Sequence, residues 1–247
     1  MYIKSAREIE IMKAAGEIVA LTFEKLKEVI KPGITTKELD QIAEKFIRDN
    51  KGTPAFLGYN GYPASICTSI NEEVVHGIPG GRVLKDGDIV GIDIGVVYNG
   101  YCGDAARTFE VGIVTENAKR LIEITKESFF KGIIMAVEGK RVQDISNAIQ
   151  TFVESNGYSV VRDLVGHGIG KNMHEAPQVP NYGRAGKGPR LKAGLTIAVE
   201  PMVNESGFHV KTLSDGWTVV TLDGSLSAHY ENTIAITTGE PKILTMV

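Results

Sequence analysis

The sequence predicts an α+β fold in which helices cover one face of a curved, largely antiparallel sheet. The first observation is the order of elements, because a pair of helical segments is followed by strand-like segments, and this layout occurs twice. The second is a repeated phrase. Residues 84–93 read L-K-D-G-D-I-V-G-I-D, and residues 191–200, 107 positions later, read L-K-A-G-L-T-I-A-V-E.

The third observation is that the helical segments 31–52 and 137–157 repeat at an offset of 106 positions, from Gly33 and Gly139 onward. Long-period self-similarity is typical of a repeated structural unit, and two copies cannot form a solenoid. We therefore expect a single domain over residues 1–247. Its two halves, roughly 1–111 and 112–247, would be related by a pseudo-two-fold axis.

Capping boxes predict where the first pair of helices begins. Ser5 with Glu8 opens a helix that we expect to run to about Ile30, and Thr35 with Glu38 opens the next. The second half repeats this layout, with helices predicted over about 116–137 and 142–155. Apolar, β-branched runs predict strands over 88–98, 101–111, 194–203, 217–222 and 231–237. Glycine and proline cluster in the loops 52–63, 77–81 and 166–190, which we expect to form the pocket walls.

Composition narrows the class of protein. The chain is 43% hydrophobic with a net charge of -3 and no long run of one sign, which argues against nucleic acid or a membrane as its main partner. No apolar stretch reaches the ~18 residues of a membrane span, and the N-terminus lacks the apolar core of a secretory signal. Two cysteines, Cys67 and Cys102, form no disulfide framework, so the expected location is the cytoplasm.

A predicted hairpin brings two acids together. Asn99-Gly100 between apolar runs is a strong two-residue turn signal. That turn places Asp93 opposite Ala106, so that Asp93 and Asp104 become diagonal neighbours on one face. Two bare carboxylates there would repel, and a divalent metal removes the conflict. The alternative is a surface hairpin with two solvated acids, which fits the apolar surroundings less well.

Further acids and histidines complete the candidate set. Glu200 closes the second copy of the repeated phrase, as Asp93 closes the first, and Glu231 begins an alternating strand. His167 and His174 lie in loops marked by glycine or proline, and so does His76. This setting favours a functional role for the three histidines over a purely structural one. Two other histidines have no such setting and are predicted to be structural: His209 and His229.

The donor types indicate which ion they would bind. Oxygen ligands with one imidazole favour Mn, Co, Fe(II) or Zn. Four carboxylates would overcharge a site for one metal ion, so two divalent ions about 3.5–4 Å apart fit better. The chain has no H-E-x-x-H, no C-x-x-C pair, no G-x-S-x-G and no P-loop, so the commonest competing chemistries are not indicated.

The motifs H-G-I-G (167–170), E-P (200–201), N-E-E-V-V-H-G-I-P (71–79) and Y-N-G-Y-P-A-S-I-C (59–67) resemble those of the bacterial type I methionine aminopeptidases, over essentially the whole chain. The resemblance implies the pita-bread fold of that family, with two halves related by a pseudo-two-fold. It makes five residues the ligands of a dinuclear site: Asp93, Asp104, His167, Glu200 and Glu231. It makes His76 and His174 substrate-contacting. Six more would line or approach the methionine pocket: Tyr59, Tyr62, Cys67, Met173, Met202 and Trp217.

The implied reaction is removal of the initiator methionine from nascent proteins with a small second residue, by a water that bridges two metal ions. Glu200 would handle the proton of this water, His174 would stabilise the developing oxyanion, and His76 would contact the scissile amide nitrogen. The expected partners are nascent polypeptide N-termini and, transiently, the ribosome, and the expected state is a monomer. Two alternatives are a proline-directed peptidase of the same superfamily and a non-catalytic peptide- or nucleic-acid-binding relative.

Overall fold

The computed structural model describes residues 1–246. Its helices are α1 (Ala6–Lys27), α2 (Thr36–Asp49), α3 (Glu116–Ile133) and α4 (Val142–Ser155). Both predicted capping boxes are present, with Ser5 and Thr35 as N-caps. Two helices are shorter than predicted, because α1 ends at Lys27 and α3 ends at Ile133. After α3 the chain tightens into turns whose N–H groups bond carbonyls three residues back, as at Ala136 to Ile133.

The strands form four small sheets, and every pair within them is antiparallel. The first sheet contains β1 (Thr53–Pro54), β2 (Cys67–Ile70), β4 (Ile89–Tyr98) and β5 (Tyr101–Glu110). The second, in spatial order, contains β15 (Lys242–Ile243), β14 (Asn232–Ala235), β9 (Thr196–Val199), β7 (Gly166–Gly168) and β8 (Glu175–Val179). The third contains β13 (Ser227–His229), β10 (Met202–Asn204) and β6 (Ser159–Val160), and the fourth β11 (Val210–Thr212), β12 (Val219–Thr221) and β3 (Glu73–Val75).

Three predictions about the strands were wrong. The segment 52–63, predicted to be loop, contains the two-residue strand β1, which pairs with β4. The strand predicted over 194–203 is two strands, β9 and β10, interrupted at Glu200-Pro201. Pro201 has no N–H to donate to a ladder, so the pairing is broken there. The segment 166–190, predicted to be loop, contains β7 and β8, because these short runs gain hydrogen bonds from each other and from β9.

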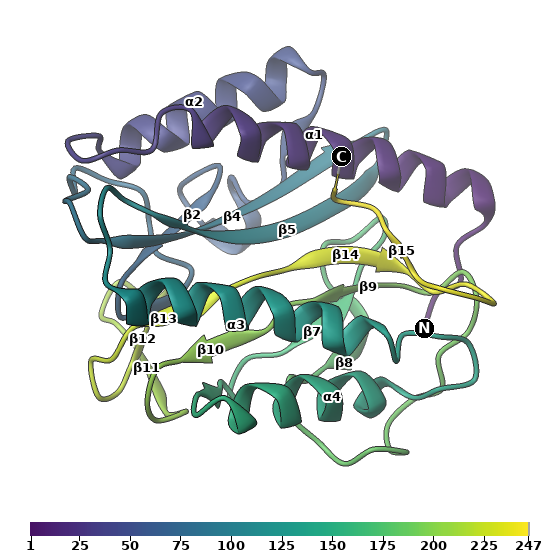
Figure 1. Ribbon diagram of the computed structural model, residues 1–247. Coiled ribbons are helices and arrows are strands. Elements are labelled where there is room, and N and C mark those ends of the chain that lie inside the picture. Colours follow the sequence, from purple (N-terminus) through teal and green to yellow (C-terminus); the bar gives the residue numbers. More distant parts are fainter. Residues whose placement is uncertain (247) are drawn as a thin grey trace.

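The helices cover the sheets in two groups (Figure 1). Residues of α1 and α2 pack against β2, β4 and β5 in one apolar cluster, centred on side chains such as Phe23, Leu39 and Ile92. Residues of α3 and α4 pack against β6, β9, β10, β13 and β14 in another, which includes Phe129 and Ile197. Each helix buries one apolar stripe on a sheet, and the opposite faces of the sheets are left to meet one another.

Helix α1 crosses β5 at unusually short range. A Cβ atom added to Gly103 would lie 2.8 Å from the backbone nitrogen of Gly16, and one added to Gly16 would lie 2.1 Å from the carbonyl oxygen of Leu244. Only glycine permits this stacking of helix, strand and C-terminal segment. The crossing holds β5 firmly at the level of the neighbouring Asp104.

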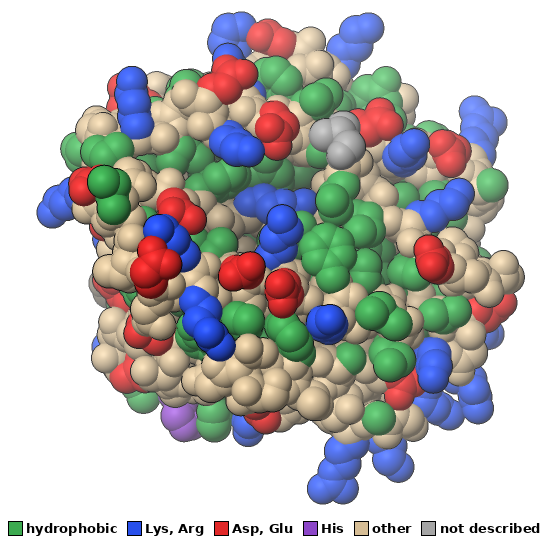
Figure 2. All heavy atoms as spheres, in the orientation of Figure 1, with side chains coloured by type: hydrophobic (Ala, Val, Ile, Leu, Met, Phe, Trp, Pro, Cys, Tyr) green, Lys and Arg blue, Asp and Glu red, His purple; other side chains and the backbone are tan. Residues whose placement is uncertain are grey.

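Charges of both signs are interspersed over the face shown in Figure 2, in keeping with the net charge of -3. Among the helices of residues 1–246, none combines the length and the apolar character that a membrane crossing needs.

Candidate metal centre and active site

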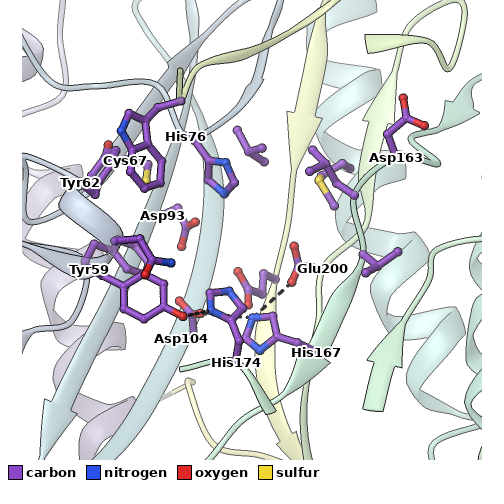
Figure 3. A pocket seen from close by; sticks show the side chains of 18 residues that line it. Tyr59, Tyr62, Cys67, His76, Asp93, Asp104, Asp163, His167, His174 and Glu200 are labelled. Atoms are coloured by element: carbon purple, nitrogen blue, oxygen red, sulfur yellow. Dashed lines mark hydrogen bonds and ion pairs between the residues drawn. The ribbon is translucent and has the colours of Figure 1, made fainter. Parts of the chain in front are cut away.

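The predicted site residues surround one cavity of about 540 Å³ (Figure 3). Its lining includes every residue predicted to bind metal or to contact substrate: Tyr59, Tyr62, Cys67, His76, Asp93, Asp104, His167, His174, Glu200, Met202, Trp217 and Glu231. Met173 differs, because it is buried in a separate apolar cluster and does not line the cavity. Its methyl group lies below Gly95 instead, where a Cβ on that glycine would be only 2.7 Å away.

The hairpin β4–β5 has the predicted register. Tyr98 pairs with Tyr101, Asp93 with Ala106, and Gly95 with Asp104, without a bulge near the turn. Asp93 and Asp104 are therefore diagonal neighbours on one face, and this face forms part of the cavity wall. Asp104 is buried, with 4% of its surface exposed.

The second pair of acids is Glu200 and Glu231. They lie where the pairing of β9 with β14 continues into the pairing of β10 with β13. Val199 pairs with Asn232 and Met202 with His229, so Glu200 and Glu231 lie opposite each other between these pairs. Side chains opposite one another in an antiparallel pair share a face. This places both carboxylates on the side that faces the hairpin.

Backbone hydrogen bonds join the two pairs of acids. Glu231 N–H donates to Ala106 O at 2.9 Å, and the Thr233 hydroxyl donates to Asp104 O at 2.9 Å. The Arg107 guanidinium reinforces this junction, because it donates to the carbonyl oxygens of Ala106 and Glu231 and stacks on the ring of Tyr230. The acids of the hairpin and those of the ladder are thereby brought into one cluster.

His167 is held with one ring nitrogen directed at the acids. Its Nδ1 lies 2.9 Å from Gly168 O, so the ring hydrogen is on Nδ1 and Nε2 has a free lone pair. Nε2 is 3.7 Å from Asp104 Oδ2 and 3.6 Å from Glu200 Oε1. The flanking glycines are required because a Cβ on Gly166 or Gly168 would lie 2.4 or 2.3 Å from a carbonyl oxygen of a neighbouring strand.

The acids leave buried polar atoms without partners. Asp93 Oδ1, Asp104 Oδ1 and Glu231 Oε1 have no hydrogen-bond partner within residues 1–246. Ligand atoms of Asp104, His167 and Glu231 all lie within 4.8 Å of one another. Buried carboxylate oxygens without donors cost free energy unless a cation compensates them. The residues therefore fit a divalent ion, with oxygen donors and one imidazole nitrogen whose lone pair is free.

Burial and mutual repulsion perturb this cluster strongly. Burial raises the pKa of Asp93 to about 7. The pKa values of Asp104, Glu200 and Glu231 are raised well above the ordinary range by burial and by the neighbouring carboxylates. Burial and the nearby His174 ring lower the pKa of His167 to about 4. A bound divalent ion would reverse the preference of the acids for their protonated forms.

This electrostatic conflict predicts a pH dependence in the metal-free protein. In the unfolded chain Asp93 ionises near pH 3.9, whereas in the folded chain its pKa is about 7. Between these values the folded state binds more protons, so its contribution to the free energy of unfolding falls as pH rises. Relative to Asp93→Asn, the wild type should lose up to ~1.4 kcal/mol per pH unit between about pH 4 and 7. Chemical denaturation in chelator measures this difference.

The histidines oppose this trend but do not obscure the comparison. Their pKa values are lowered in the folded protein, so they add stability as pH rises toward about 6.5 in wild type and variant alike. If the difference in free energy of unfolding between wild type and Asp93→Asn does not change with pH, the pKa of Asp93 is not raised in the folded protein.

The apolar part of the cavity lies beside the acids. Tyr62 and Trp217 pack edge to face with their ring centroids 5.1 Å apart, and Cys67 and Phe56 complete the cluster. The Tyr62 hydroxyl lies 3.1 Å from Ile66 O and 3.0 Å from Gly77 O and shares its one hydrogen between these carbonyls, so the ring is fixed. This wall is apolar and rigid, as pockets for apolar side chains are.

His76 and His174 both line the cavity, and in Figure 3 they lie above and below Asp93. His76 has a φ of 61°, a left-handed conformation uncommon for a residue with a side chain and often associated with function. His174 Nδ1 is 2.7 Å from the Tyr59 hydroxyl, and its ring centroid is 4.3 Å from that of His167. Burial lowers the pKa of both His76 and His174, which favours neutral rings.

The structure also adds residues that the sequence did not single out: Phe56, Asn60, Val75, Asp163, Leu164 and Val165. They flank predicted site residues, so proximity in sequence was the available signal. His229, predicted to be structural, lies beside the acids, with Nε2 at 4.0 Å from Glu200 and 3.9 Å from Glu231. Its position two residues before Glu231 on a strand was the signal that sequence reasoning missed.

Comparison with known proteins identifies the class of protein that this fold and site define. The model of Metallopeptidase family M24 matches residues 10–238, so the chain belongs to this family of metal-dependent peptide-bond hydrolases.

More specific relatives place the chain within the family. It is 59% identical over 245 residues to the methionine aminopeptidase of Clostridium perfringens, which covers 99% of this chain and 98% of that one. It matches the crystal structure of methionine aminopeptidase from Thermotoga maritima with a TM-score of 0.98 and 47% identity over all of both chains. The prolidase from Pyrococcus horikoshii is more distant, with a TM-score of 0.79, 25% identity and coverage of 99% of this chain and 63% of that one. The chain is thus grouped with the methionine aminopeptidases, and its fold is the pita-bread fold predicted.

Proposed function

We propose that this protein removes the initiator methionine from nascent polypeptides whose second residue is small. The observation that carries the proposal is the junction of a buried cluster of acids and imidazoles with an apolar pocket inside one cavity. The acids would fix the reaction centre, and the pocket beside them would select the side chain of the first residue. The relatives named above support the same assignment.

The ligands we propose are Asp93, Asp104, His167, Glu200 and Glu231. Four acids and one imidazole balance the charge of two divalent ions better than that of one, and their donor types suit Co, Mn, Fe(II) or Zn. When bound, the ions would supply a water of lowered pKa as the nucleophile.

The other steps are assigned to side chains of this chain. Glu200 would accept the proton of the attacking water and pass it to the leaving amine, because its carboxylate borders the cavity beside the other acids. A Tyr59 hydroxyl that donates to Nδ1 of His174 leaves the ring hydrogen on Nε2, where it can donate to the substrate carbonyl and to the oxyanion. His76 would contact the scissile amide nitrogen.

The methionine pocket is assigned to the apolar wall. Tyr62, Cys67 and Trp217 would surround the thioether, and Tyr59 would close the side toward the solvent. Burial raises the pKa of the Cys67 thiol well above its ordinary range, so it remains neutral and acts as a small apolar group. A long unbranched side chain fits such a pocket better than a charged or β-branched one does.

The expected setting follows from this role. We propose that the protein works as a monomer in the cytoplasm, on nascent N-termini and with transient ribosome contact. Its two cysteines are both free and buried, as is usual in a reducing compartment.

Peptide selectivity tests the proposal. We expect release of methionine from Met-Ala and Met-Gly peptides, and turnover of Met-Lys and Ala-Pro peptides to be at least roughly 100-fold slower, since the apolar pocket and a cramped second position each discriminate. The measurement is kcat/KM for the four peptides on metal-loaded enzyme. Faster release of residues before proline would assign the chain to the proline-directed peptidases instead. Peptide binding without any cleavage would indicate a non-catalytic relative.

A further inference from the structure

His229 is a buried polar residue that the proposed mechanism does not use. Only 4% of its surface is exposed, and its Nε2 has no hydrogen-bond partner within residues 1–246. An unpaired ring nitrogen costs free energy at such a position. This unpaired nitrogen lies directly beside the acids, so its neighbours indicate which role it has.

The Glu200 carboxylate lies between two imidazoles. Its Oε1 is 3.6 Å from His167 Nε2, and its Oε2 is 4.0 Å from His229 Nε2. The same nitrogen of His229 is 3.9 Å from Glu231 Oε2. Both separations at His229 are longer than a hydrogen bond, so its ring is placed between two carboxylates without being bonded to either. Polar contacts in active sites are often long before the reactants are bound.

The strand geometry accounts for this arrangement. Met202 pairs with His229, and Glu231 follows His229 by two residues, so their side chains lie on one face of the ladder. Glu200 is the diagonal neighbour of His229 on that face. The ladder therefore fixes His229 relative to both carboxylates, whichever ion is present.

The two imidazoles differ in ways that assign different roles. His167 lines the cavity, and its Nδ1 is bonded to a carbonyl oxygen, which leaves Nε2 without hydrogen. His229 is absent from the cavity lining, and its Nε2 has no hydrogen-bond partner within residues 1–246. A neutral imidazole with Nε2 facing carboxylates is most stable with the hydrogen on that nitrogen. His229 thus faces the acids from the side away from the cavity, with Nε2 as a hydrogen-bond donor.

We infer that His229 is a positioning residue, whose single Nε2 hydrogen is directed between the carboxylates of Glu200 and Glu231 and orients them for binding divalent ions. The inference rests on the proposed function, because it needs these two acids to be ligands. Groups that orient ligating carboxylates typically change metal affinity by 10- to 100-fold when they are removed.

The test is titration of the metal-free protein with Co²⁺, monitored by calorimetry and by the visible absorption of the bound ion. His229→Gln keeps a neutral N–H donor, whereas His229→Phe keeps a planar ring without one. His229→Leu is a second donor-free variant in case the phenylalanine ring does not fit. His209→Leu is the matched control, because His209 is exposed and is not among the residues that line the cavity. The melting temperature of each metal-free protein shows whether it is folded.

We expect His229→Phe and His229→Leu to bind Co²⁺ roughly 10- to 100-fold more weakly than wild type. Their metal-free melting temperatures should be unchanged or raised, since an unpaired buried polar group is removed. His229→Gln should recover the affinity and keep the wild-type absorption bands, and His209→Leu should match wild type throughout.

Three results would overturn the inference. If the folded donor-free variants bind Co²⁺ with wild-type affinity, the imidazole does not position the two carboxylates. Shifted absorption bands and no recovery of affinity in His229→Gln would make His229 a direct ligand. Failure of the wild type to bind Co²⁺ would overturn the proposed function itself, and is distinguished from the other two because it does not involve a variant.

Discussion

Replacing Asp104 with alanine is expected to reduce peptidase activity below detection and to lower the number of divalent ions bound, while the fold persists. Asp104 is buried, its Oδ2 lies 3.7 Å from His167 Nε2, and its Oδ1 has no hydrogen-bond partner in the described part of the chain. Among the acids it belongs to the group whose ligand atoms converge most closely. Removing it therefore takes away an oxygen donor at the centre of the proposed site.

The stability of this variant separates a ligand from a structural residue. Burial, and then repulsion from Asp93 and Glu200, raises the pKa of Asp104, so the metal-free variant should lose no stability through its charges. The β4–β5 ladder and the bonds to Thr233 use backbone atoms of Asp104, which alanine keeps. A small cavity is the remaining cost, of about 1 kcal/mol.

The measurements are metal content by elemental analysis, turnover of a Met-Ala peptide, and the melting temperature in chelator. Asp104→Asn repeats the test without a change of volume. Asp49→Ala is the control, since Asp49 is an exposed acid on α2 that pairs with Lys45. Full metal content together with normal turnover in Asp104→Ala would show that the hairpin does not supply ligands.

The second large effect concerns His174. His174→Ala should keep the bound ions and lose turnover by roughly 10²–10³-fold, as expected on removal of an oxyanion donor. His167 already provides an imidazole to the acids, and His174 meets Tyr59 rather than a carboxylate. The loss should therefore appear in kcat, with unchanged metal content.

A purely structural role for His174 predicts a different outcome. His174 is an exposed residue whose ring is only partly desolvated by its neighbours, so truncation should change the free energy of unfolding by no more than about 0.5 kcal/mol. If the residue only packs in its loop, the melting temperature falls and the rate per folded molecule stays near normal. Tyr59→Phe refines the comparison, because it removes the hydroxyl that bonds Nδ1 and keeps the imidazole; its loss of turnover should be smaller. Loss of a bound ion from His174→Ala would show that His174 is itself a metal ligand and that the proposed ligand set is incorrect.

The sequence predicted the hairpin site because the information there is local. Asn99-Gly100 fixes the turn, and the turn fixes the pairing of Asp93 with Ala106, so a single short hairpin brings the two acids together. The capping boxes at Ser5 and Thr35 were local in the same way, and both helices begin where predicted. Short-range geometry of this kind follows from residue types and spacing alone.

Other parts of the fold depended on partners distant in sequence. Strands β7 and β8 are short and rich in glycine and proline, and their hydrogen bonds come from each other and from β9. No local pattern marks such a strand, because tertiary pairing outweighs intrinsic propensity. The interruption at Glu200-Pro201 was visible as a proline, yet the run of apolar residues on both sides favoured one continuous strand.

The sequence by itself determined which residue types form the candidate centre: the hairpin acids, the glycine-flanked His167 and the two strand-end glutamates. Only the tertiary structure decided how they meet. Bonds between β5 and the segment at Glu231 bring the two pairs of acids together, and burial there perturbs their pKa values. It also decided the place of His229, whose strand face points at the acids only when β10 and β13 are paired. The local sequence determines which donor groups are available, whereas tertiary packing of distant segments determines the distances between them.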